Sequence, residues 1–470
     1  MKILRFIFFA SLVVCGGAAD AESSLRSASD GIKNGQLSGW AFDPANPSAS
    51  VTVSIYRDGP KGSGALIGSF PTTVMRPDVN GHFNVTGAHG FSWKVPAADQ
   101  NRLHMWYVYA AGAGENDEQV NSSPLVHPAI TATEIGAPQA VFTYATDKCE
   151  RVDIPDQPAR AYRDAYGNVN LIASHYIARR AIGRTLDTVT HQCPIIHPSD
   201  NDPTFGAFRY HEWLQAPYTI DGKTIYAYMH SEWYGELVDR SCDGDMIDGW
   251  VNAIALAISR DGGASFNLPN DYLVRYPVTP WNKSFPCNSS NPTRYGDFDG
   301  TNIVFKDGYY YKLFRYVTEP SVLEQQSGVC LMRTQNIGDA SAWEIWNGHG
   351  YIRSKTSSCA FIPNLVDVAS VTYNTYAKMY VVVGYIKARG FYFAVSPDLI
   401  NWSTRMPVTV NGLDTSNTPY PSLLDSADTS RNFERTGQEP YLYYTQSHGG
   451  LNRDLMRVQI KFSDPASDGK

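Results

Sequence analysis

A short run at 226–235, YAYMHSEWYG, combines acid–base side chains with aromatic rings. His230 and Glu232 stand two positions apart at the end of an alternating stretch, so on a strand they share one face. Aromatic neighbours can stack on the apolar face of a ligand, and burial beside them raises the pKa of a carboxyl group towards neutrality. The pattern suits a general acid. We expect Glu232 to be that acid, with His230 and Trp233 binding the substrate.

Three aspartates alternate with arginines in the stretch CERVDIPDQPARAYRDAYG at 149–167. An arginine beside a carboxyl group favours the ionised form, which suits a base that activates water or a partner that steers it. Salt bridges with a purely structural role are the alternative for each member. The candidates are Asp153, Asp156 and Asp164 for catalysis and Arg160 and Arg163 for substrate binding.

Further polar residues follow other strand-like stretches. Asp299 stands in YGDFDGTNIVF (295–305) and is a further catalytic candidate. His175 and His448 are candidates for hydrogen bonds to substrate hydroxyl groups, with a structural histidine as the alternative for each.

An acidic cluster, CDGDMIDG, occupies residues 242–249. Its carboxylates Asp243, Asp245 and Asp248 offer the oxygen ligands that calcium prefers. The cluster lacks the twelve-residue spacing and terminal Glu of an EF-hand, so a solvated acidic loop is the alternative. We expect no required cofactor and treat calcium as an optional structural ion.

The elements that must position these residues are strands. From about residue 140, strand–turn–strand groups recur every fifty to seventy residues with almost no helical periodicity between them, a pattern that predicts a five-bladed β-propeller over 140–465. Turns with an Asp end several strands, as in SRDGGASF (259–266) and SPDLINW (396–402). We also expect AVFTYA (140–145) to complete the last blade.

The amino-terminal part has a different texture. Residues 1–21 begin with positively charged residues, continue with an apolar run and end in small residues typical of a cleavage site. This pattern predicts a secretory signal peptide. Residues 25–128 read as an antiparallel β-sandwich and 129–139 as a linker. Trp40, Trp93 and Trp106 are expected in its core, with stacking on sugar rings as the alternative.

The composition limits which classes of partner and which cellular compartment are plausible for this protein. The net charge is −7 and the chain has no basic run, so nucleic acid is an unfavourable partner. No stretch of the mature chain is long and apolar enough for a membrane helix. Six cysteines beyond the leader fit three disulfides in an oxidising compartment, so we expect a secreted protein; the sequence leaves its oligomeric state open.

Two resemblances add to this reading. GWAFDPANPSASVTVSIYRDGPKGSG (39–64), RPDVN (76–80) and HGFSWKVP (89–96) resemble an accessory β-sandwich module of exported bacterial proteins. The carboxy-terminal part resembles the five-bladed propellers around glycoside hydrolase family 43, through its SxDL…NW turns and DGYYY hairpins, and SRDGGASF fits the Asp-box of propeller blades. That family implies a base on the first blade, an acid-tuning Asp on the second and a Glu acid on the third, whereas the third group here has no Glu.

Three functions follow as hypotheses. The first is a secreted glycoside hydrolase acting on a carbohydrate through a carboxylate acid and base. The second is a sialidase-like or uronate-acting hydrolase or lyase that grips a carboxylate through forked bonds from an arginine cluster. The third is a propeller that binds carbohydrate without cutting it. The cluster behind the second comprises Arg160, Arg163, Arg179, Arg180 and Arg184.

Overall fold

The computed structural model describes residues 25–463, except for 101–102, 113–116, 128–129, 238–248, 283–284, 286–292, 321–324, 412 and 414–416. The predicted signal peptide and the cysteines Cys242 and Cys287 lie outside the described residues. The chain divides into two compact units. The smaller comprises 25–55, 67–94 and 108–121, and the larger comprises 122–463 together with 56–66 and 95–107.

The amino-terminal strands form two sheets, ordered β1-β2-β5 and β4-β3-β6-β7, with β8 beside β6. On β2 and β3 alternate side chains are buried, including Leu37 and Val53, and Phe91 on β5 is buried as well. Trp106 is fully buried, as expected for a core residue. The strands are β1 (Arg26–Lys33), β2 (Gln36–Phe42), β3 (Thr52–Arg57), β4 (Ala65–Pro71), β5 (Gly90–Lys94), β6 (His104–Ala111), β7 (Asp117–Gln119) and β8 (Leu125–His127), with helix α1 at Pro77–Phe83 and a 3₁₀ turn, η1, at Ala97–Asp99.

Twenty of the remaining strands form five antiparallel groups of four, the blades of a propeller, within the described residues. The all-β fold expected from the sequence is therefore confirmed. Blade 1 has β11 (Arg160–Arg163), β12 (Val169–Ile172), β13 (Ala181–Gly183) and β14 (Thr190–His191). Blade 2 has β15 (His211–Tyr218), β16 (Ile225–Tyr234), β17 (Trp250–Ser259) and β18 (Leu273–Arg275). Blade 3 has β19 (Arg294–Gly300), β21 (Tyr309–Val317), β22 (Ser327–Thr334) and β23 (Glu344–Trp346), extended by β20 (Val304–Lys306) and β24 (Tyr351–Arg353).

Blades 4 and 5 complete the set. Blade 4 has β25 (Val368–Asn374), β26 (Met379–Ile386), β27 (Gly390–Ser396) and β28 (Met406–Thr409). Blade 5 has β29 (Ser422–Leu424), β31 (Tyr441–Ser447), β32 (Arg453–Ser463) and, from the other end of the unit, β10 (Gln139–Phe142). The short β30 (Arg435–Thr436) pairs with β25. The helical pieces are α2 (Tyr144–Asp147), η2 (Gly235–Leu237) and η3 (Ala340–Ala342).

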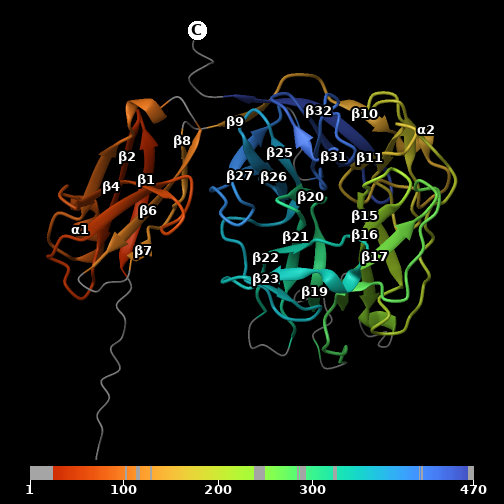
Figure 1. The fold of residues 1–470 in the computed structure, drawn as a ribbon, viewed down its shortest axis with the longest axis horizontal. Coiled ribbons are helices and arrows are strands. Elements are labelled where there is room, and N and C mark those ends of the chain that lie inside the picture. Colours follow the sequence, from red (N-terminus) through yellow and green to blue (C-terminus); the bar gives the residue numbers. More distant parts are fainter. Residues whose placement is uncertain are drawn as a thin grey trace, which may run out of the picture. The chain divides into compact units, whose positions relative to one another are not determined.

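Strands from both ends of the unit close the propeller. β10 runs antiparallel to β32, so the expectation that 140–145 completes the last blade is confirmed for 140–142, whereas Tyr144 begins helix α2; Figure 1 shows the two strands side by side. The predicted linker 129–139 also contains a strand, β9 (Thr131–Glu134), which pairs with both β28 and β32. Main-chain hydrogen bonds fix this segment, which the Ser, Pro and Thr content had marked as a linker.

The Asp-bearing turns stabilise the blade hairpins as the sequence predicts. After β17, Oδ1 of Asp261 accepts the N–H groups of Ala264 and Ser265, both at 3.0 Å. Gly263 has φ of 89°, and a Cβ there would lie 1.8 Å from the Tyr162 hydroxyl, so glycine is required. The turn returns Phe266 to the core between blades 1 and 2, where it is 4% exposed.

One buried arginine ties the first strands of the blades together. Arg160 on β11 donates to the main-chain carbonyls of Gln215, Gly300 and Ala369, which belong to blades 2, 3 and 4. Gln215 and Ala369 stand at register breaks of their strand pairs, so the guanidinium supplies hydrogen bonds to buried carbonyls there. Contacts of β11 with β15 and β29, and of β25 with β19 and β29, continue the ring.

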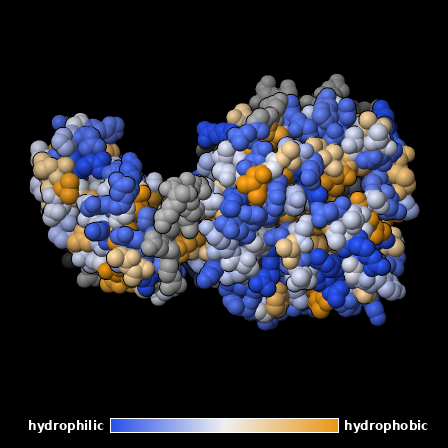
Figure 2. Space-filling view, turned by 90° about the horizontal axis from the view of Figure 1, so that it is seen from above, coloured by the Kyte–Doolittle hydropathy of each residue, from blue (hydrophilic) through white to orange (hydrophobic). Residues whose placement is uncertain are grey.

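No helix in the described part of the chain has the length and apolar character of a membrane span. On the face shown in Figure 2, hydrophobic residues are scattered among hydrophilic ones. Two disulfides join Cys149 to Cys193 and Cys330 to Cys359.

Candidate active site

A cavity of about 550 Å³ lies among the first strands of the propeller, and all five blades contribute to its wall. Blades 1 and 2 supply most of its titratable groups. The polar and aromatic side chains that line it are Asp156, His175, Tyr176, His211, Trp213, His230, Glu232, Tyr234, Trp250, Arg294, Phe298, Arg315, Asp367, Tyr385, Lys387, Tyr420 and Arg453.

The β15–β16 hairpin carries the densest part of this wall. On β16 the alternation directs His230, Glu232 and Tyr234 to the cavity. The register pairs His211 with Glu232 and Trp213 with His230 across the two strands, so these residues share that face. Five side chains of one hairpin therefore meet at the cavity.

Glu232 is buried, 4% exposed, and both of its carboxyl oxygens have partners. His230 Nε2 lies 2.7 Å from Oε1, and the Tyr234 hydroxyl donates to Oε2. Burial raises the pKa of Glu232, the negative charge of Asp156 adds to that rise, and the bonds from His230 and Tyr234 oppose it. Glu232 is thus a carboxyl group whose environment favours the protonated form.

Asp156 provides the second carboxyl group of the cavity, just before β11. Its oxygen Oδ1 forms an ion pair with Arg453 on blade 5 and accepts the Tyr420 hydroxyl at 3.4 Å. His175 Nε2 lies 3.5 Å from Oδ2. The main-chain N–H of Asp156 donates to the Ala173 carbonyl, which fixes the segment against blade 1.

Two of the cavity histidines, His175 and His211, favour the neutral form. Burial, together with the charge of the nearby His175, lowers the pKa of His211 to about 4. Burial also lowers the pKa of His175, against the opposing charge of Asp156. His211 stacks on Tyr176 with ring centroids 4.0 Å apart, and its Nδ1 lies 3.3 Å from the Tyr234 hydroxyl. Neutral imidazoles can each donate one hydrogen bond and accept another.

Blade 3 and the end of blade 2 add aromatic rings with arginines over them. Trp250 and Phe298 meet edge to face at 5.3 Å. The guanidinium carbon of Arg294 lies 5.8 Å from the Trp250 ring centroid, and that of Arg315 lies 5.7 Å from the Phe298 centroid. These rings give the cavity flat apolar surface beside cationic groups.

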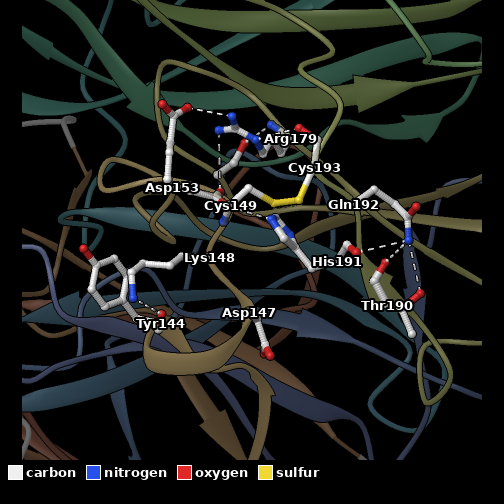
Figure 3. Close-up of polar contacts among 12 residues, drawn as sticks. Tyr144, Asp147, Lys148, Cys149, Asp153, Arg179, Thr190, His191, Gln192 and Cys193 are labelled. Carbon is white, nitrogen blue, oxygen red and sulfur yellow. Dashed lines mark hydrogen bonds and ion pairs between the residues drawn. A yellow bond between two sulfur atoms is a disulfide. The ribbon is translucent and has the colours of Figure 1, made fainter.

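Asp153, one of the predicted catalytic residues, does not line this cavity. It is 1% exposed beside the Cys149–Cys193 disulfide, where it accepts His191 Nε2 and the Cys149 N–H, both at 2.8 Å (Figure 3). Arg179 lies near its other oxygen, 3.9 Å away. These contacts account for Asp153 as a residue that anchors the segment before blade 1.

Asp164, Arg160 and Arg163 also lie away from the cavity wall. Asp164 caps the turn between β11 and β12 by accepting the N–H groups of Tyr166 and Asn168, both at 2.9 Å. Arg160 is the buried arginine that binds carbonyls of three blades. Arg163 donates to the carbonyls of Asp428 and Ser430 in blade 5. The remaining arginines of the predicted cluster bond elsewhere: Arg179 to Glu150, Arg180 to Asn170 and the Gly262 carbonyl, and Arg184 to the Tyr166 carbonyl.

Trp233 and His448 are not part of the cavity wall either. Trp233 is fully buried on the opposite face of β16, packs against Phe205 and donates its indole N–H to the Pro203 carbonyl. His448 is partly exposed and pairs with Asp454 at 3.0 Å. Of the predicted site residues, the cavity collects Asp156, His175, His230 and Glu232.

The remaining predictions fall outside the described side chains. Asp243, Asp245 and Asp248 lie in 238–248, so the calcium site stays a prediction. Asp299 lies in β19, and its side chain is not among those described. Its neighbour Asp297 is buried in an ion pair with Arg275 at 2.9 Å and does not line the cavity.

One described group gathers side chains of metal-binding type: Cys149, Asp153 and His191. The sulfur of Cys149 is bonded to Cys193, and Arg179 places a positive charge beside Asp153. A disulfide sulfur is not the thiolate that binds metals, so this group does not fit a metal ion in the oxidised protein.

Several residues of the wall were not foreseen. His211 and Trp213 alternate in HEWLQ, so period-two spacing was a usable signal for these two, whereas Tyr234 was expected only as one of the aromatic neighbours of Glu232. Tyr420 and Arg453 lie 264 and 297 residues beyond Asp156 in the sequence, and no local pattern marks them.

No protein-family model and no curated protein sequence matches the chain. Among solved structures, a protein of unknown function from Dyadobacter fermentans aligns with 70% of this chain and 100% of its own, at 12% identity and a TM-score of 0.39. A xylan β-1,4-xylosidase from Bacillus halodurans aligns with 65% of this chain and 53% of its own, at 11% identity and 0.37. A Penicillium chrysogenum α-L-arabinanase, solved with arabinobiose, aligns with 94% of each chain at 10% identity and 0.33.

Proposed function

We propose that the chain is a secreted glycoside hydrolase that uses Glu232 as general acid and Asp156 as the partner that activates water. One observation carries the proposal: a buried carboxyl group with a raised pKa shares a cavity with a second, ion-paired carboxylate. Glycosidic bond cleavage uses two carboxyl groups, one whose environment keeps it protonated and one whose environment keeps it ionised.

In the first step, protonated Glu232 delivers its proton to the leaving glycosidic oxygen. Tyr234 and His230 hold the carboxyl group in place during the transfer. Tyr234 then stabilises the carboxylate that forms by its hydrogen bond to Oε2, and His230 does the same at Oε1 in the tautomer that carries a proton on Nε2.

In the second part of the reaction, Asp156 accepts a proton from the attacking water. Arg453 and Tyr420 orient its carboxylate from blade 5. Trp213, Trp250 and Phe298 supply aromatic faces on which sugar rings stack. Carboxyl groups perform every proton transfer, so the reaction needs no cofactor.

The test is product analysis by chromatography after incubation of the mature protein with arabinans, xylans and uronate polymers, with and without calcium. New oligosaccharides or monosaccharides that disappear with Asp156→Asn support the proposal. The anomeric form of the first product, read by NMR, separates inversion from retention. Intact polymers throughout the panel would contradict it.

A non-catalytic carbohydrate-binding protein is the second candidate, because both oxygens of Glu232 are already engaged. Such a protein would be retained by one polymer of the panel without releasing products. Asp156→Asn would then change retention only modestly.

A further inference from the structure

The charge of the cavity differs in sign from the charge of the chain. The whole sequence has 46 acidic and 39 basic residues. The cavity wall reverses that balance, with more cationic side chains than carboxylates, and a wall of this kind attracts anions. The cations are Arg294, Arg315, Lys387 and Arg453, and the carboxylates are Asp156, Glu232 and Asp367.

The negative charge of these carboxylates is largely compensated. Asp156 pairs with Arg453, and Asp367 Oδ1 lies 3.2 Å from Arg315 Nη1. The burial of Glu232 raises its pKa, which lowers its charge near neutral pH. The cavity therefore does not repel an anionic ligand through its own carboxylates.

The Arg315 side chain on β21 is fixed by several contacts but keeps one N–H group for a ligand. Its Nε donates to Ser327 Oγ at 2.9 Å, its Nη1 pairs with Asp367, and its guanidinium lies over Phe298. Among the described residues, Nη2 has no partner. The side chain is 37% exposed, so a ligand in the cavity can reach it.

Lys387 follows β26 on the neighbouring blade. It is exposed, lines the same cavity, and forms no ion pair within the described part of the chain. Lys387 and Arg315, which also pairs with Asp367, thus bring two cationic side chains from blades 3 and 4, whereas Asp156 and Glu232 come from blades 1 and 2.

We infer that the cavity takes a saccharide that bears a carboxylate, and that Arg315 and Lys387 bind this carboxylate. The inference rests on the proposed function and names its substrate class. A guanidinium and an ammonium both form charge-assisted hydrogen bonds to carboxylate oxygens. These two residues differ from the arginine cluster that the sequence suggested, whose described members bond to main-chain carbonyls, Asn170 and Glu150.

The experiment measures retention of the full-length mature protein in gels that contain polygalacturonate, alginate or glucuronoxylan. Each polymer is run beside its carboxyl-reduced form, which keeps the linkage and loses the charge. A sulfated neutral glucan is the second anionic probe. The variants are Arg315→Gln and Lys387→Gln, and Lys223→Gln removes an exposed charge away from the cavity as the matched control.

We expect at least one uronate polymer to retain the protein, its reduced form to retain it far less, and each cavity variant to weaken binding about tenfold or more. Lys223→Gln should bind like the wild type. Equal retention by acidic and reduced polymers, no retention by any uronate polymer, retention by the sulfated glucan alone, or an equal loss in Lys223→Gln would overturn the inference.

The two proposals fail in different ways. Glu232-dependent cleavage of neutral polymers, without a preference for uronates, would remove this inference and leave the hydrolase standing. Charge-dependent binding of a uronate polymer, with turnover unaffected by Glu232→Gln, would support the carboxylate-binding inference and remove the proposed role of Glu232.

Discussion

The phenol of Tyr234 donates a hydrogen bond to Oε2 of Glu232, two residues earlier on the same strand. Burial raises the pKa of Tyr234 well above its usual value, so the phenol stays protonated and remains a donor. The pair joins the buried acid to His211 on the neighbouring strand, whose Nδ1 lies 3.3 Å from the phenol oxygen. Tyr234 is thus a positioning residue for Glu232.

Replacing this phenol should shift the pH dependence of the reaction. The Tyr234 bond lowers the pKa of Glu232, so Tyr234→Phe should raise that pKa further. Because the acid must be protonated, the basic limb of the kcat/KM profile should move to higher pH. Tyr228→Phe is the matched control. Tyr228 lies on the same strand as Tyr234, is buried outside the cavity, and donates its hydroxyl to the Ile337 carbonyl. An unchanged limb in Tyr234→Phe would remove the assigned role.

Arg160 should be a stability residue. Arg160→Met leaves the buried carbonyls of Gln215, Gly300 and Ala369 without the guanidinium, and we expect a loss of about 3–5 kcal/mol in the free energy of unfolding. Arg184→Met, at an exposed position, should stay within about 0.5 kcal/mol of the wild type. Denaturant unfolding measures both. Equal stability of the two variants would show that the carbonyls find other donors.

Asp153 should make the free energy of unfolding depend on pH in the acidic range. Burial alone would raise the pKa of Asp153, but its bonds to His191 and the Cys149 N–H more than offset this, and the pKa lies below the usual 3.8. A lowered pKa in the folded state means that its contribution is present above pH 3.8 and is lost as the pH falls through the folded-state value.

Asp153→Asn should therefore cost about 2 kcal/mol at pH 7 and progressively less towards pH 2. Thermal unfolding of both proteins across that range gives the comparison. A stability difference that does not change with pH would assign the effect to packing.

The sequence predicts the propeller well because its signals are local. The turn with Asp261 and the return of Phe266 to the core each depend on a few neighbouring residues. The strand β9 was missed because its pairing partners, β28 and β32, come from the far end of the sequence.

The site was predictable only in part, for a related reason. His230 and Glu232 share a strand face that the spacing reveals, and the same rule excludes Trp233, which faces the core. Arg160 illustrates the limit. Its type suggests substrate binding, but its partners are carbonyls of three other blades, and only the closed ring brings them together.

The most direct test of the central claim compares kcat of Glu232→Gln with that of Glu434→Gln on a polymer that the wild type cleaves. Glu434 is a matched control: burial also raises its pKa, Tyr218 donates to its Oε1 at 3.1 Å, and it does not line the cavity. With folding of both variants checked by circular dichroism, we predict that Glu232→Gln loses about a hundredfold or more in kcat and Glu434→Gln stays within a few-fold of wild type. A Glu232→Gln protein that turns over as fast as the Glu434→Gln protein would contradict the assignment of Glu232 as the acid.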